Sequence, residues 1–114
     1  MLFDKSTFKV TAGKRVKIIF DNNDSMPHNI IIGKPGSLEK LGAAADAMLS
    51  DRSAVEKGYV PSSPDIIASM GLLFPGQKEV MNFTAPKSPG DYVYVCTFPG
   101  HWRIMKGIMK VDPY

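Results

Sequence analysis

The sequence predicts an all-β fold, a Greek-key β-sandwich with a helical flap inserted at about residues 36–70. Short segments that are β-branched, or that alternate apolar and polar residues, recur along the chain. Nine prolines and ten glycines supply turns between them. The stretch at 36–70 differs, because helix formers in its first part are followed by several turn residues. These observations favour one sandwich domain that spans residues 1–114.

The first three strands are predicted before the flap. Residues 7–11 and 15–20 each alternate with period two, and residues 12–14 form a turn between them. The polar loop 21–25 follows. The β-branched run 28–32 then predicts a third strand.

The flap and the remaining strands complete the expected fold. Residues 37–49 predict a helix with Ser37 as its N-cap, and the prolines and serines of 50–65 exclude long regular structure. The apolar positions of the helix recur near helical spacing: Leu38, Leu41, Ala45, Met48 and Leu49. Further strands are predicted at 64–69, 79–84, 91–96 and 107–111.

Composition excludes several classes of protein. A chain of 114 residues holds one modest core, which rules out a multidomain enzyme. A net charge of +3 favours an acidic partner weakly, but the dense basic clusters of nucleic-acid binders are missing. No apolar run approaches the roughly 20 residues of a membrane span, and residues 1–5 lack the features of a secretion signal. We therefore expect a chain that is cytoplasmic, already processed or cut from something longer.

Four side chains offer metal-ligating atoms. Cys96 ends a predicted strand, and His101 and Met105 follow it on one loop. His28 opens another strand, and it would lie at the same end of the sandwich if strands 28–32 and 91–96 are neighbours. Two imidazoles, a thiolate and a thioether match the ligand set of a blue-copper electron-transfer site.

Other interpretations of these residues are weaker. A lone cysteine is more often a small buried hydrophobe, and a methionine is ordinary core filler. A Cys–His nucleophile would need an orienting group and an open cleft, and a zinc site would ordinarily have more thiolates or carboxylates. The coincidence of all four donors favours copper, and we assign no catalytic residue.

The run Cys96-Thr97-Phe98-Pro99-Gly100-His101, followed by Met105 and preceded far upstream by Pro27-His28-Asn29, resembles the azurin branch of the cupredoxins, the blue copper proteins. The resemblance covers about residues 7–114. It implies a cupredoxin-like sandwich with one type 1 copper ion. It also implies that His28, Cys96 and His101 bind copper equatorially, with Met105 at a longer axial distance.

The resemblance assigns supporting roles as well. Asn29 would tie its loop to the Cys96 loop near Thr97, and the backbone N–H groups of Asn29 and Phe98 would hydrogen-bond the sulfur and tune the potential. An apolar partner surface would surround an exposed edge of His101, through which electrons pass. Its residues are Met26, Phe98, Pro99 and Gly100.

Three features depart from the family pattern. Pro27 stands where azurins have a glycine whose carbonyl approaches copper, so a plastocyanin-like four-coordinate site is expected. Met1 aligns with the second strand region of azurins, so we expect the sandwich to lack the usual first edge strand. Trp102 follows His101 where smaller residues are usual, and we expect it to cover the histidine or to serve as a partner anchor.

We therefore predict a one-electron carrier and not an enzyme, periplasmic or extracytoplasmic by family resemblance. Its partner would be a redox protein such as a c-type cytochrome, or an attached dehydrogenase or haem domain. Two alternatives stay open: a copper delivery or storage domain, and a cupredoxin domain excised from a larger multidomain redox enzyme. A free sheet edge would also invite weak dimerisation.

Overall fold

The computed structural model describes residues 3–114 and confirms an all-β fold with one helical insertion. Its elements are, in chain order, β1 (Thr7–Thr11), β2 (Arg15–Asp21), β3 (His28–Gly33), α1 (Leu38–Ala47), the 3-10 turn η1 (Met48–Ser50), β4 (Ile66–Leu73), β5 (Lys78–Thr84), β6 (Gly90–Val95) and β7 (Lys106–Asp112). The expected strand at 64–69 begins and ends later, because β4 pairs with β3 as far as Leu73.

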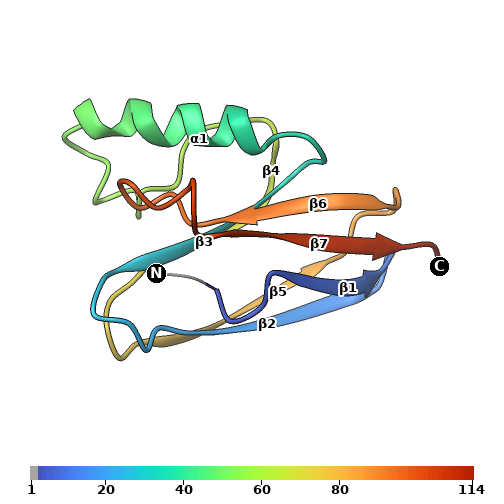
Figure 1. Ribbon diagram of the computed structural model, residues 1–114. Coiled ribbons are helices and arrows are strands. Elements are labelled where there is room, and N and C mark those ends of the chain that lie inside the picture. The colour runs from blue at the N-terminus through green and yellow to red at the C-terminus, as the bar shows by residue number, and fades with distance from the viewer. Residues whose placement is uncertain (1–2) are drawn as a thin grey trace.

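The strands form two sheets. One has the order β1-β7-β6-β3-β4, and the other contains β2 and β5. The β1–β7 pair is parallel, and the other pairs are antiparallel. Figure 1 shows the large sheet between the β2–β5 pair on one side and α1 on the other. The domain is therefore a sandwich with a helix on one outer face.

Alternation along the strands builds a core on each face of the large sheet. Between the sheets lies a cluster of buried side chains from both: Ala12, Ile30, Ile32, Met81, Tyr92, Tyr94, Met109 and Val111. On the opposite face, Ile31, Val93 and Val95 pack against α1. Because both faces are covered, every residue of β3 is buried.

The helix α1 presents its predicted apolar face to the sheet, with two differences. Leu41 and Ala45 of α1 are buried, whereas Met48 and Leu49 lie beyond the helix in η1, where Met48 is buried and Leu49 is exposed. Ser37 stands at the N-cap position, yet its hydroxyl donates to the Lys34 carbonyl and does not cap the helix. Its backbone carbonyl accepts the first helical hydrogen bond from Leu41.

The β2 edge is free among residues 3–114, since β2 pairs only with β5. A groove of about 580 Å³ runs along it and is lined mainly by apolar side chains, including Phe8, Val10, Val16, Ile18 and Phe20. This edge of the two-stranded sheet is therefore unpaired within the described part of the chain.

The helix is fastened to the loop that follows β6 through Trp102. The indole lies against Gly42, and its Nε1 donates to the Asp46 carboxylate at 3.1 Å. Arg103 stacks over the same ring, with its guanidinium carbon 4.5 Å from the ring centroid, and donates to the other oxygen of Asp46. A side chain at position 42 would overlap the indole.

Substituting Gly42→Ala should destabilise the domain by about 1–3 kcal/mol in urea unfolding, because the new methyl group overlaps the indole of Trp102. Helix propensity alone predicts the opposite sign, a gain of roughly 1 kcal/mol. In a Trp102→Leu background the same change should be neutral or stabilising. Stabilisation of the otherwise unaltered protein would show that the indole does not constrain this position.

Candidate metal centre

The pairing of β3 with β6 brings His28 to Cys96. The two strands are neighbours, with Ile31 opposite Val95, so the start of β3 lies beside the end of β6. His28 is the first residue of β3, and Cys96 directly follows β6. This adjacency was the condition under which the sequence placed both residues at one end of the sandwich.

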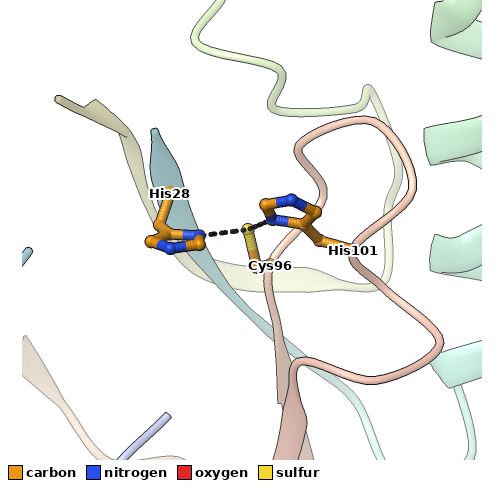
Figure 2. Close-up of side chains that lie close together, drawn as sticks. All are labelled: His28, Cys96 and His101. Atoms are coloured by element: carbon orange, nitrogen blue, oxygen red, sulfur yellow. Dashed lines mark hydrogen bonds between the residues drawn. The ribbon is translucent and has the colours of Figure 1, made fainter. Parts of the chain in front are cut away.

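The donor atoms converge in a buried pocket. Cys96 Sγ lies 3.8 Å from His28 Nδ1 and 3.6 Å from His101 Nδ1, and the three atoms lie within 4.8 Å of one another. Figure 2 shows the two rings on opposite sides of the sulfur, each with a nitrogen directed at it. All three residues are buried. The Nδ1 atoms, and not the Nε2 atoms, are therefore available to one ion.

These separations fit a metal ion. A trigonal ion with bonds of about 2.0 Å to nitrogen and 2.3 Å to sulfur holds its nitrogen and sulfur donors roughly 3.7 Å apart. The observed distances of 3.8 and 3.6 Å agree with that value without any rearrangement of the chain. One thiolate with two imidazoles is also the donor set that copper electron-transfer sites use.

Met105 closes the loop that carries His101. Its backbone N–H donates to the His101 carbonyl at 2.8 Å, and its carbonyl accepts from the Cys96 N–H at 3.0 Å. The side chain is 2% exposed and lines the same cavity as His28. His28, Cys96, His101 and Met105 are thus positioned for a single copper ion.

A buried asparagine ties the segments of the site together. Asn29 Oδ1 accepts from the Thr97 N–H at 2.7 Å, and its Nδ2 donates to Thr97 Oγ1 at 2.9 Å. The same Nδ2 group donates to the carbonyls of Gly58 and Tyr59 in the flap. The tie between Asn29 and Thr97 that the resemblance implied is present, and it extends to the flap.

Burial and hydrogen bonding act in opposite directions on the Cys96 thiol. Burial raises its pKa, and the hydrogen bonds from the backbone N–H groups of Asn29 and Phe98 oppose that rise. These two N–H groups are the ones that the resemblance placed at the sulfur. They favour a thiolate, which is the form that binds metal.

The imidazole of His101 is more enclosed than the sequence suggested. The prediction of an exposed His101 edge is wrong, since the residue is 2% exposed and the ring of Phe98 lies 5.0 Å away between centroids. Tyr59 in turn packs edge-on against Phe98. Burial, followed by the nearby His28, lowers the pKa of His101. Its Nε2 atom has no hydrogen-bond partner among the residues described.

A carboxylate that sequence reasoning missed contacts the other histidine. Asp24 Oδ2 lies 2.9 Å from His28 Nε2, on the side of the ring opposite the metal-facing Nδ1. This hydrogen bond, together with one from the Ser25 N–H, holds the pKa of the Asp24 carboxyl far below its usual range. The spacing of Asp24 four residues before His28 was the available signal, but a polar loop gave no reason to single out one of its residues.

The residues predicted to form a partner surface differ in their exposure. Met26 is 40% exposed, Gly100 is exposed, and Phe98 and Pro99 are half-buried near His101. Trp102 does not belong with them. It is 7% exposed and neither covers the histidine edge nor stands ready as an anchor, because its ring is occupied by Gly42 and Asp46 of α1.

The fold and the buried donor set together define a cupredoxin, a β-sandwich that binds copper between loops at one end. The family model for copper-binding proteins of the plastocyanin/azurin family matches residues 1–112. The chain therefore belongs to the plastocyanin/azurin family of copper-binding proteins.

Individual relatives agree with this assignment. Auracyanin-A of Chloroflexus aurantiacus is 35% identical over 114 residues, which cover 98% of this chain and 68% of the relative. Azurin of Achromobacter denitrificans is 32% identical over 120 residues, covering 98% of this chain and 73% of the relative. The auracyanin and azurin relatives are electron carriers and not enzymes, which is the class that the sequence predicted.

A solved structure gives the same answer. Auracyanin A, described as a "blue" copper protein from the green thermophilic photosynthetic bacterium Chloroflexus aurantiacus, superposes with a TM-score of 0.86 at 37% identity. The match covers 97% of this chain and 89% of that one. No helix within residues 3–114 has the length and apolar character to cross a membrane.

Substituting Asn29→Ala should destabilise the metal-free protein by roughly 3 kcal/mol, because the Thr97 N–H and the flap carbonyls lose a buried partner. Urea unfolding measures the change. The exposed Asn23→Ala is the matched control and should cost less than about 0.5 kcal/mol. Equal effects of the two substitutions would show that the hydrogen bonds of Asn29 do not stabilise the fold.

Acid should destabilise the metal-free protein through His101. Its pKa is lowered in the folded state, so the unfolded chain takes up a proton first as the pH falls below about 6.5. The free energy of unfolding should therefore decline between pH 7 and pH 5. A His101→Gln variant should show a shallower decline, and an unchanged slope would contradict this origin.

Proposed function

We propose that the protein carries single electrons between redox partners through a type 1 copper ion. The observation that carries the proposal is the convergence of one thiol and two imidazole Nδ1 atoms, within 4.8 Å of one another, in a buried pocket of a cupredoxin fold. Copper, when bound, would supply the Cu(I)/Cu(II) couple. The chain's part is to hold the donors and to exclude water.

The proposed ligand roles follow the donor chemistry. His28 Nδ1, Cys96 Sγ and His101 Nδ1 would bind in one plane, and Met105 would supply a weak axial thioether. The role of Met105 is supported by its burial and by the cavity that it lines together with His28. The carbonyl of Pro27 is assigned no role.

Rigid placement of the donors suits electron transfer. Hydrogen bonds from Asn29 hold the Cys96 loop to the flap, and the backbone bonds within 98–105 hold His101 and Met105. A site that keeps one geometry in both oxidation states needs little rearrangement when an electron arrives or leaves. Buried ligands also oppose the rapid exchange expected of a copper delivery or storage domain.

The proposed partner surface consists of Met26, Phe98, Pro99 and Gly100. An electron would leave through His101, whose ring lies 5.0 Å from that of Phe98 between centroids and whose Nε2 has no hydrogen-bond partner among residues 3–114. The partner would be a redox protein such as a c-type cytochrome, or an attached dehydrogenase or haem domain. A net charge of +3 favours an acidic docking face on that partner.

We also propose a periplasmic or other extracytoplasmic location, supported by the relationship to azurins and auracyanins. The single-domain organisation of residues 1–114, and its alternative as one domain of a larger redox enzyme, stay predictions. Weak dimerisation through the free β2 edge is likewise a prediction.

Cys96→Ser should abolish the intense visible band of the copper-loaded protein, because that band arises from the thiolate–copper bond. The absorption spectrum after one equivalent of Cu(II) is the measurement. Circular dichroism should show an intact fold, as serine is close in size to cysteine. Persistence of the band in a folded variant would remove Cys96 from the site.

Met105→Leu should retain copper and raise the reduction potential, since an apolar side chain replaces a weak electron-donating thioether. Voltammetry gives the potential, and the metal content is measured on the same sample. Complete loss of copper would show that Met105 is more than a weak axial ligand.

A further inference from the structure

The hydrogen bond between Asp24 and His28 sets one histidine of the site apart from the other. His28 Nε2 lies 2.9 Å from Asp24 Oδ2, and its side chain is 4% exposed, against 33% for that of Asp24. His101 Nε2, in contrast, has no hydrogen-bond partner among the residues described. The two imidazoles would therefore meet the same ion with different supporting groups.

In the loop that precedes β3, hydrogen bonds hold both the carboxylate and the backbone of Asp24. Asp24 Oδ1 accepts from the Ser25 N–H at 2.7 Å, and the Asp24 N–H donates to Asn22 Oδ1 at 3.0 Å. Asn22 is itself buried, and its Nδ2 donates to the carbonyls of Met26 and Leu73. The carboxylate is thus orientated by a network anchored in the body of the domain.

We propose that Asp24 is a positioning residue for the copper ligand His28, and that its charge lowers the reduction potential of the site. This inference rests on the proposed function. The hydrogen bond requires the proton of a neutral imidazole to sit on Nε2, which leaves the Nδ1 lone pair directed at Cys96 and the metal. It also prevents rotation of the ring.

The charge of the carboxylate adds an effect that a neutral acceptor would lack. A carboxylate bonded to the remote N–H of a ligating imidazole makes that ring a stronger donor. Stronger donation and a nearby negative charge both stabilise Cu(II) relative to Cu(I). The potential should therefore lie lower than in the same site with an uncharged group at position 24.

Partial exposure of Asp24 reduces the desolvation penalty of its carboxylate. Asp24 borders a cavity of about 630 Å³ that His28 and Met105 also line, and its side chain is 33% exposed while its Oδ2 contacts the buried ring. A charge that keeps part of its hydration avoids most of the penalty of burial. It still acts on the metal through one imidazole.

The orienting role is tested first without copper. At a pH where His28 is neutral, long-range proton–nitrogen NMR of the metal-free protein should show its proton on Nε2. In Asp24→Ala, the proton should be shared between the two ring nitrogens. Predominant protonation of Nδ1 in the unaltered protein would overturn the orienting role. This result does not depend on the metal, so it stands apart from the proposed function.

The tuning role is tested on the copper-loaded protein by voltammetry. Asp24→Asn keeps one oxygen acceptor, which can face His28 Nε2, but it loses the second oxygen, which accepts from the Ser25 N–H, and it removes the charge. It should shift the potential upward. Asp21→Asn is the matched control. Asp21 is an exposed residue at the end of β2, three positions before Asp24, and its substitution removes the same charge. Its shift should be clearly smaller.

Equal shifts in the two variants, or no shift in Asp24→Asn, would overturn the tuning role. The blue absorption band should survive in Asp24→Asn, since all four donors are kept. If the unaltered protein itself binds no copper, the proposed function fails, and the NMR result alone decides whether Asp24 orients His28.

Discussion

The adjacency of β3 and β6 is the constraint on which the rest of the site depends. Pairing in the middle of the large sheet places His28 beside Cys96, although 68 residues separate them along the chain. A slip of one residue in this register would turn the alternating side chains to the opposite faces. The cores above and below the sheet therefore hold the two donors in register.

Holding these donors together in the absence of a metal has a free-energy cost. A thiol and two imidazoles are buried next to one another, the pKa of Cys96 is raised, and the pKa of His101 is lowered. The Asn29 network and the contact between Trp102 and α1 stabilise the loop against that cost. Burial of the donors therefore lowers the free energy of unfolding of the metal-free protein, and binding of the ion would raise it again.

Most of the strands and the four donors could be predicted from the sequence, because alternation and spacing report directly on them. The surroundings of the donors could not. From the sequence, Trp102 is expected to cover His101 or to serve as a partner anchor, but in the structure its ring packs on Gly42 and Asp46 of α1. The packing of Phe98 against His101 and the contact between Asp24 and His28 depend on loop conformations, for which period and composition carry no signal.

The most direct test of the central claim is the electron paramagnetic resonance spectrum of the protein with one equivalent of Cu(II). A thiolate and two imidazoles held in a trigonal arrangement predict a narrow copper hyperfine splitting together with an intense blue colour. A wide splitting from a colourless, tetragonal site would contradict the account, because it would show copper bound away from Cys96.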